Sequence, residues 1–232
     1  MQFVKKVKLS HDTFEFYFKR ESFFLYKPGQ YISLHLKEKT ITLPTYSFTI
    51  SSSPSEKKYI TITTKVNNKS PFKNRLFKLS ANEKISYKGP FGEFTLDTNA
   101  ANQLFLAGGI GVTPFHSMIT YAANKKLSNN LYLFVSFTES NEVVYFDVLQ
   151  NIAKRHSNIK IIYTITNQSE DKSWDGERGR ITTNLINKYL DVKQIDKIMI
   201  VGPLKMTIAM EELVSTLDLK NDNVQIEVFS GY

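Results

Sequence analysis

The stretch from Leu104 to Pro114 reads LFLAGGIGVTP, an apolar run followed by three glycines, a threonine and a proline. The apolar run is typical of a buried strand, and Thr113 and Pro114 are residue types preferred at the N-cap and first position of a helix. The stretch therefore predicts a strand, a tight turn and a helix start. Backbone N–H groups at such a start favour an anion, and glycines let a pyrophosphate approach the backbone.

Phosphate binding is thus the first functional hypothesis for this stretch, and a plain turn is the alternative. The spacing Gly-Gly-x-Gly-x-Thr-Pro departs from the dinucleotide fingerprint Gly-x-Gly-x-x-Gly, because Pro114 stands where the third glycine would be. The choice between the two interpretations needs the rest of the chain.

The composition of the 232 residues, 41% hydrophobic and 13% aromatic, suffices for two modest domains or one large one. The chain has no cysteine, which excludes disulfides, thiolate-held iron–sulfur clusters and thiol nucleophiles. Redox chemistry would therefore need a bound organic cofactor. The four histidines show no metal-ligand spacing, so we predict no metal.

The formal net charge is +8, from 30 Lys and Arg against 22 Asp and Glu. Such an excess could attract nucleic acid, an anionic membrane surface, phosphorylated cofactors or an acidic protein. The lysines are spread over the whole length, so we predict no nucleic-acid partner. The first nine residues alternate like a strand and lack the apolar core of a signal peptide, and no apolar run could span a bilayer. We expect a cytoplasmic protein.

Residues 1–98 have the pattern of short strands separated by turns. Phe14, Phe16 and Phe18 alternate with polar residues or tyrosine, and residues 30–36 alternate again after a Pro-Gly turn. Ser70 and Pro71 introduce one short helical pattern. This spacing predicts an antiparallel β-barrel or sandwich as the first domain.

Residues 99–232 have a different pattern, in which apolar runs alternate with helical segments. The runs are residues 104–107, 131–137, 159–165, 198–201 and 224–229, and the helical segments include 115–123, 143–153, 183–190 and 204–217. This alternation predicts an α/β domain with a five-stranded parallel sheet. Right-handed crossovers would place the loops at 108–114 and 202–203 on one edge, where such sheets bind ligands.

Four stretches in this order resemble the ferredoxin–NADP(+) reductase superfamily of flavin reductases, in its single-chain form without an iron–sulfur domain. They are PTYSFTISSSP from Pro44, SPFKNRL from Ser70 (leading to GPFGEF from Gly89), GGIGVTP from Gly108 and VGPLKM from Val201. The resemblance covers nearly the whole chain. It implies an N-terminal FAD-binding β-barrel followed by an NAD(P)-binding α/β domain.

On the flavin side, the resemblance implies that Tyr46 stacks its ring on the isoalloxazine and that Ser47 hydrogen-bonds near flavin N5. An aromatic face would hold the flat ring, and a hydroxyl would steady the reacting edge. Taken without the other motifs, both would be plain strand residues. Further cofactor contacts are expected from Phe48, Thr49, Thr63, Thr64, Lys65 and Ser70.

One departure from the family motif lies at Pro44, where the family has an arginine that faces the flavin pyrophosphate. Losing a charge-assisted contact should weaken flavin binding unless another cation substitutes. Lys65, Lys73 and Arg75 are the candidates. FAD is the expected flavin.

On the nicotinamide side, the resemblance implies cofactor contacts from two loops. The residues are Gly109, Gly111, Thr113 and Pro114 in the first loop and Gly202, Pro203 and Met206 in the second. Val201 replaces the family cysteine. Thr138 stands where NADPH-specific members tend to have arginine, which favours NADH, whereas Arg178 and Arg180 could reverse that preference.

The chain ends in Tyr232, and in this family a terminal aromatic often covers the second flavin face and moves before nicotinamide stacks there. A frayed terminus is the alternative. Glu227 could support the active site as the late glutamate does in plant-type members, or it could be a surface carboxylate. With Ser47, these two are the candidate catalytic residues.

The resemblance implies an enzyme that moves a hydride from NAD(P)H to FAD N5 and passes electrons onward. The acceptor would be a small acidic carrier such as ferredoxin or flavodoxin, or a small molecule. The alternative is a nucleotide-binding electron-transfer or regulatory subunit without independent turnover, which the changes at Pro44 and Val201 would permit.

Overall fold

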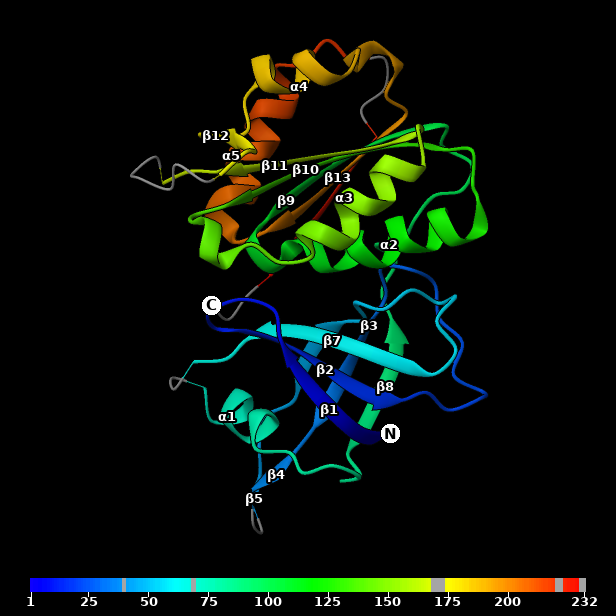
Figure 1. The fold of residues 1–232 in the computed structure, drawn as a ribbon, viewed down its shortest axis with the longest axis vertical. Coiled ribbons are helices and arrows are strands. Elements are labelled where there is room, and N and C mark those ends of the chain that lie inside the picture. Colours follow the sequence, from blue (N-terminus) through cyan, green and yellow to red (C-terminus); the bar gives the residue numbers. More distant parts are fainter. Residues whose placement is uncertain (39–40, 68–69, 168–173, 220–222, 230–232) are drawn as a thin grey trace.

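An antiparallel unit and a parallel-sheet unit make up the fold, seen in a computed structural model that describes residues 1–38, 41–67, 70–167, 174–219 and 223–229. The N-terminal unit lies below the C-terminal unit in Figure 1, and helices of the second unit face strands of the first. None of the helices in the described ranges is long and apolar enough to cross a membrane. The exact division of the chain at residues 98 and 99 stays a prediction.

The N-terminal unit is a closed antiparallel barrel, as predicted. Two three-stranded sheets, in the orders β1-β2-β7 and β6-β3-β8, are joined by a bridge between Ile50 and Ile62 and another between Gln2 and Lys84. The elements are β1 (Gln2–Lys8), β2 (Thr13–Lys19), β3 (Tyr31–His35), β6 (Tyr46–Thr49), β7 (Tyr59–Lys65) and β8 (Ser86–Phe91), with the small hairpin β4 (Lys37–Glu38) and β5 (Ile41–Thr42) and the helix α1 (Pro71–Phe77).

Side chains along β2 point alternately into the barrel and away from it. Phe16 and Phe18 are fully buried inside, where they meet other apolar residues of one core cluster. Glu15 points the other way and is nevertheless only 7% exposed. Its burial follows from the second unit, which covers this side of the barrel.

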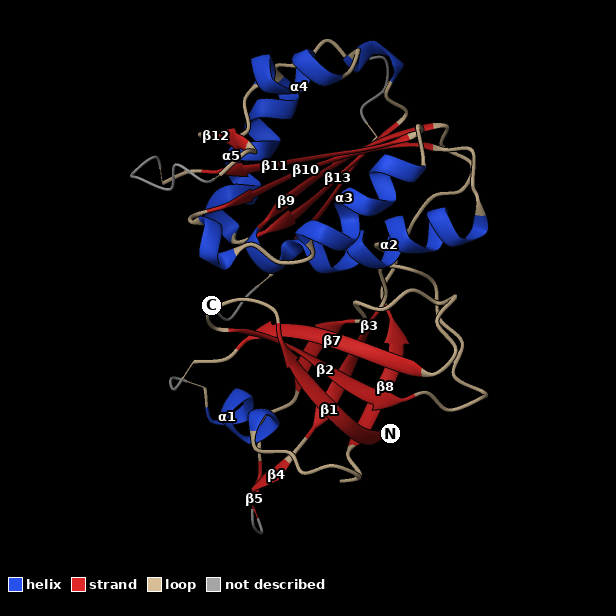
Figure 2. Cartoon of the chain, in the orientation of Figure 1, coloured by secondary structure: helices blue, strands red, loops and turns tan. Residues whose placement is uncertain are grey.

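The C-terminal unit is a parallel sheet in the order β12-β11-β10-β9-β13-β14, with helices on both faces (Figure 2). Its strands are β9 (Asn102–Gly108), β10 (Asn130–Phe137), β11 (Ile159–Ile165), β12 (Glu177–Arg178), β13 (Lys197–Gly202) and β14 (Val224–Val228). The helices are α2 (Val112–Lys125), α3 (Phe146–Arg155), α4 (Thr183–Tyr189) and α5 (Leu204–Ser215), with the short 3-10 turns η1 (Gly109–Gly111), η2 (Ser140–Glu142) and η3 (Val192–Gln194).

The predicted count of five strands is one too low, because β12 adds a sixth at the edge beside β11. This strand has only two residues, Glu177 and Arg178, and it lies at the rim of the sheet. A short edge strand contains no apolar run, so it lacks the sequence signal that marks a buried strand.

The helix start at the glycine loop also differs from the prediction. Helix α2 begins at Val112, with Gly111 as its N-cap, so the predicted N-cap at Thr113 and first position at Pro114 are wrong. The cause is the 3-10 turn η1, which leads directly into α2, so that the helix begins at Val112, before the predicted start. The Thr113 hydroxyl donates to the Ile110 carbonyl oxygen at 3.1 Å. Pro114 still lies in the first turn, where its missing N–H costs no helical hydrogen bond.

The order of the strands shows where along the sheet a ligand is expected to bind. From β9 the chain goes to β10 on one side and only later returns to β13 on the other, so the order reverses between β9 and β13. Open parallel sheets bind ligands in the crevice at such a reversal, outside the carboxyl ends of the strands. The loops after Gly108 and Gly202 lie at this point, as the sequence predicted.

Candidate active site between barrel and parallel sheet

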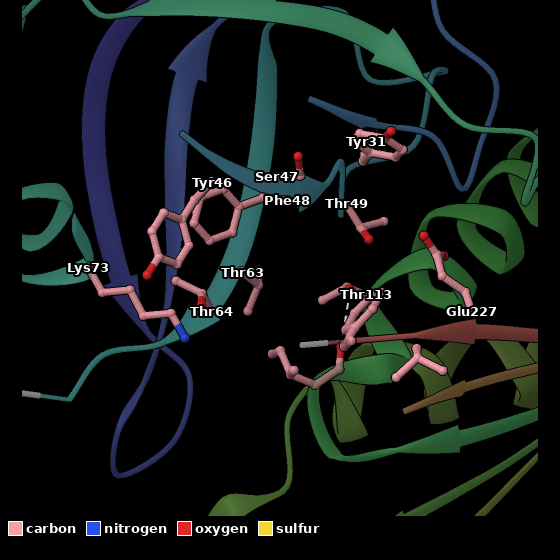
Figure 3. Close-up of a pocket in the computed structure, with 13 residues that line it drawn as sticks. Tyr31, Tyr46, Ser47, Phe48, Thr49, Thr63, Thr64, Lys73, Thr113 and Glu227 are labelled. Carbon is pink, nitrogen blue, oxygen red and sulfur yellow. Dashed lines mark hydrogen bonds between the residues drawn. The ribbon is translucent and has the colours of Figure 1, made fainter. Parts of the chain in front are cut away.

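A pocket of about 280 Å³ opens between the two units and receives side chains from both (Figure 3). The barrel contributes Tyr31, Tyr46, Ser47, Phe48, Thr49, Thr63 and Thr64, α1 contributes Lys73, and the second unit contributes Ile110, Thr113, Glu227, Val228 and Phe229. This volume lies near the small end of ligand pockets, which run from about 300 to 1,000 Å³. Eight of the residues predicted to bind or act on cofactor meet here.

Strand β6 presents the flavin-side residues of the prediction. The ring of Tyr46 stacks on Phe72 of α1, with 4.7 Å between ring centroids and 22° between planes. Ser47 is exposed, and its Oγ lies 2.9 Å from Ser33 Oγ on β3. One face of the Tyr46 ring thus packs against Phe72, and the Ser47 hydroxyl remains accessible to a ligand.

The Glu227 side chain extends from β14 into the pocket, and the pKa of its carboxyl is shifted. Burial raises the pKa of its carboxyl to about 7. Its Oε2 atom is buried and has no hydrogen-bond partner within the described part of the chain. A buried polar atom of this kind normally finds a partner, so the geometry fits a ligand group at this position.

The glycine loops after β9 and β13 pack against each other. A Cβ at Gly108 or Gly202 would lie 2.8 or 2.7 Å from Met206 Sδ, and one at Gly111 would lie 2.5 Å from the Val201 carbonyl oxygen. These three glycines therefore allow close approach of the two loops. Gly109 differs, because its φ is +54° and a Cβ there would meet no atom of the described residues within 4 Å. Its open backbone is the part of the loop that a ligand could approach.

Other predicted residues lie outside the pocket lining. Lys65 ends β7, and its Nζ lies 3.0 Å from Glu142 Oε1. The Ser70 hydroxyl caps α1 by accepting from the Lys73 backbone N–H at 3.2 Å. Thr138 follows β10 and is exposed, and Pro203 is the N-cap of α5. Tyr232 lies outside the described residues.

The structure adds pocket residues that the sequence analysis did not single out for the site. Tyr31 reaches the pocket from β3, and Phe229 follows Glu227 by two residues. The Phe229 backbone N–H donates to the Gly202 carbonyl oxygen at 3.0 Å, which ties the end of β14 to the second glycine loop. An aromatic residue two positions after a candidate catalytic glutamate was the available signal for Phe229, whereas Tyr31 showed only strand alternation.

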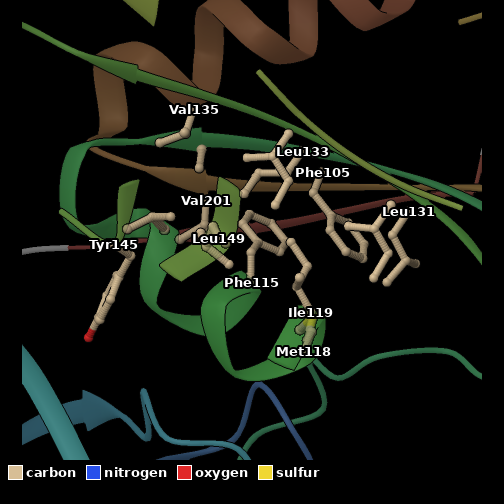
Figure 4. Close-up of a cluster of buried hydrophobic side chains, with 14 of the residues drawn as sticks. Phe105, Phe115, Met118, Ile119, Leu131, Leu133, Val135, Tyr145, Leu149 and Val201 are labelled. Atoms are coloured by element: carbon tan, nitrogen blue, oxygen red, sulfur yellow. The ribbon is translucent and has the colours of Figure 1, made fainter. Parts of the chain in front are cut away.

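A buried polar network joins the two units beside the pocket. Tyr145 points out of the apolar cluster of the second unit toward the barrel (Figure 4). Its hydroxyl lies 2.5 Å from Thr63 Oγ1 and donates to Glu15 Oε1 at 3.2 Å. The ring of His116 stacks on the Tyr145 ring at 3.8 Å between centroids, and its Nδ1 donates to the Ser51 carbonyl oxygen at 2.8 Å. Burial lowers the pKa of His116, so its imidazole stays neutral.

Replacing Tyr145 with phenylalanine should therefore loosen the junction between the units. The ring would keep its stacking on His116, while Thr63 and Glu15 would lose a buried partner, at a cost of about 1 to 3 kcal/mol. Urea unfolding at neutral pH measures this cost. Tyr132→Phe, on the β10 strand away from the junction, is the control and should change stability by less than about 0.5 kcal/mol. Equal losses in both variants would contradict the role of this network.

Two family models match the chain. The oxidoreductase FAD-binding domain matches residues 1–96, and the oxidoreductase NAD-binding domain matches residues 105–212. The chain belongs to the ferredoxin–NADP(+) reductase superfamily. The two matches divide between the barrel and the parallel sheet, as the resemblance implied.

Relatives within this superfamily include two curated proteins. NADH-cytochrome b5 reductase 2 of Lodderomyces elongisporus is 29% identical over 56% of this chain and 45% of its own length. The glycine betaine monooxygenase reductase subunit of Pseudomonas aeruginosa PAO1 is 27% identical over 87% of this chain and 56% of its own. The chain thus spans about half the length of these relatives.

A solved structure shares the fold over almost the full chain. It is the flavohem-like FAD/NAD binding domain of nitric oxide dioxygenase from Vibrio cholerae, with a TM-score of 0.83 and 15% identity, and the match covers 98% of both chains. The likeness extends over both the barrel and the parallel sheet.

The residues present fit FAD and a nicotinamide nucleotide. The pocket offers an aromatic ring at Tyr46, an accessible hydroxyl at Ser47 and a carboxyl oxygen of Glu227 that has no hydrogen-bond partner among the described residues. Gly109 offers an open backbone beside the start of α2. A flat heteroaromatic ring system with phosphate groups has the complementary chemistry.

Proposed function

We propose that this chain takes a hydride from a reduced nicotinamide nucleotide onto bound FAD and passes the electrons to a separate acceptor. The observation that carries the proposal is the shared pocket, into which β6 brings Tyr46 and Ser47 while the second unit brings Thr113 and Glu227. Hydride transfer requires the two rings to be held together, and one pocket made by both domains does so.

Bound FAD supplies the atom, flavin N5, that accepts the hydride and its two electrons. The chain supplies orientation and a proton site. The Tyr46 ring offers an apolar face, and the Ser47 hydroxyl offers a hydrogen bond to the reacting edge. Glu227, with a pKa of about 7, can hold or release a proton near neutral pH.

A ferredoxin or flavodoxin remains our proposal for the acceptor, with a small molecule as the second candidate. The net charge of +8 supports an acidic carrier, because complementary charge raises the encounter rate. The names of the two curated relatives point to a cytochrome and to a monooxygenase as their own partners.

NADH is the proposed donor. Thr138 and Glu139 follow β10, where a 2′-phosphate would need a cation, and Glu139 accepts from Asn167 Nδ2 at 3.2 Å. Arg178 donates to the Trp174 carbonyl oxygen at 3.2 Å. A carboxylate at this edge disfavours the extra phosphate of NADPH.

Ser47→Ala should slow flavin reduction about tenfold, which is the loss expected for one hydrogen bond to the reacting edge. Stopped-flow absorbance of the FAD-loaded protein measures the rate. Ser86→Ala removes an exposed hydroxyl on β8 outside the pocket lining and should change the rate by less than about twofold, since a surface change away from the reacting edge is worth little. Identical rates in wild type and Ser47→Ala would remove Ser47 from the reaction.

The experiment that tests the function is a steady-state assay of the FAD-loaded chain with NADH or NADPH and ferricyanide, then with purified ferredoxin or flavodoxin. Turnover with ferricyanide and a higher kcat/KM for NADH than for NADPH would support the proposal. A chain that binds nucleotide but gives no turnover with any acceptor would support the alternative, a regulatory subunit.

A further inference from the structure

The sequence leaves three candidates for the cation that replaces the family arginine at Pro44, and the structure separates them. Lys65 holds its amine 3.0 Å from Glu142 Oε1 and 3.9 Å from Asp12 Oδ2. The Arg75 guanidinium pairs with Glu83 and donates to the Lys37 carbonyl oxygen at 2.9 Å. Both side chains thus have acidic partners away from the pocket lining.

Lys73 is different, because its side chain lines the pocket. It is the single basic residue among the described residues that do so. It extends from α1 past the ring of Tyr46, and its amine points toward Thr64 (Figure 3). The residue is only 5% exposed. Its side chain therefore lies where it can contact a ligand that fills the pocket.

The surroundings of Lys73 favour an anionic ligand over a neutral one. Burial lowers the pKa of its amine, and Lys65 lowers it further, while Asp12 opposes both effects. An anion within the pocket would restore the ordinary pKa by stabilising the ammonium form. The phosphate groups of a flavin nucleotide are anions that the proposed cofactor brings to this pocket, whereas its ring system carries no comparable charge.

We infer that Lys73 binds a phosphate group of FAD and so performs the task of the arginine that Pro44 lacks. This inference rests on flavin binding in this pocket, which the proposed function also uses. A charge-assisted contact of this kind contributes more to affinity than a neutral hydrogen bond. Lys73 is therefore a residue that selects phosphorylated flavins.

The test measures the affinity of the apoprotein for FAD, FMN and riboflavin by flavin fluorescence, in wild type and Lys73→Met. We expect Lys73→Met to weaken FAD binding about tenfold or more, as loss of a charge-assisted contact implies, with little change for riboflavin. FMN binding should weaken as much as FAD binding if the phosphate shared by the two flavins is the one contacted. If only FAD binding weakens, the contacted phosphate is the one next to the adenosine.

Two control variants make the test specific. Lys78→Met removes an exposed lysine just after α1 and should leave all three affinities within about twofold, because a remote surface charge is screened. Lys73→Arg keeps the charge and should retain most of the preference for phosphorylated flavins. Circular dichroism of each variant shows whether it has folded.

Several outcomes would overturn the inference. An equal loss for riboflavin and FAD in folded Lys73→Met would assign Lys73 a packing role, and unchanged affinities would assign it none. A selective loss of phosphorylated flavins in Lys65→Met or Arg75→Met, with none in Lys73→Met, would give the role to that residue. If the wild type binds none of the three flavins, the proposed function fails as well.

Discussion

Replacing Gly111 with alanine is expected to destabilise the protein by about 2 to 3 kcal/mol, in the range for overpacking a tight contact. The new Cβ would lie 2.5 Å from the Val201 carbonyl oxygen and 2.9 Å from its carbon. Both are backbone atoms of β13, which pairs with β9 on one side and β14 on the other. The strand cannot move away without breaking one of these pairings.

The same substitution should weaken binding of the nicotinamide nucleotide more than tenfold, a shift of about 1.4 kcal/mol or greater, since it separates the two loops at the ligand edge. Urea unfolding and nucleotide titration of the variant measure the two effects. Gly109→Ala is the matched control for stability: its Cβ would meet no described atom within 4 Å, and the left-handed φ costs it about 1 to 2 kcal/mol. A larger loss of stability in Gly109→Ala than in Gly111→Ala would contradict the packing argument.

Glu227→Gln is expected to make the apoprotein more stable than wild type at alkaline pH. Burial raises the pKa of this carboxyl from 4.5 to about 7 in the folded state. Below pH 4.5 the group is protonated in both states and contributes nothing. As pH rises to 7, the unfolded chain ionises first, so folding loses up to about 3 kcal/mol, and glutamine avoids this loss.

Urea unfolding of the two proteins at pH 4.5 and pH 8 checks this prediction. The difference between Glu227→Gln and wild type should be near zero at the lower pH and about 1 to 3 kcal/mol at the higher pH. Glu211→Gln, on an exposed position of α5, should show no such growth with pH. A difference that stays constant with pH would mean that Glu227 ionises normally in the folded protein.

Most of the fold could be predicted because its signals are local. The apolar runs at 131–137 and 159–165 match β10 and β11, since a strand buried on both faces has no polar alternation to obscure it. The edge strand β12 and the early start of α2 could not be predicted in this way. The two-residue strand β12 depends on pairing with the preceding strand β11, and the start of α2 depends on a 3-10 turn that no residue type demands.

Residues within the family motifs could be assigned to the candidate site from the sequence. Residues whose position depends on how the two units pack together could not. Tyr46, Ser47 and Glu227, which the resemblance singles out, line one pocket, and their roles there stay predictions. Glu15 gave no sign of its burial, because its partner Tyr145 lies 130 positions away in the chain. The distinction between Lys73, which lines the pocket, and Lys65, which does not, likewise required the folded arrangement of α1 and β7.

The measurement that tests the central claim most directly is anaerobic mixing of the FAD-loaded protein with NADH, and separately with NADPH, while flavin absorbance is followed. We predict rapid loss of the oxidised flavin absorbance, faster with NADH, because one pocket holds the flavin side of β6 and the nucleotide side of α2 together. A protein that retains FAD but is reduced by neither nucleotide would contradict the account.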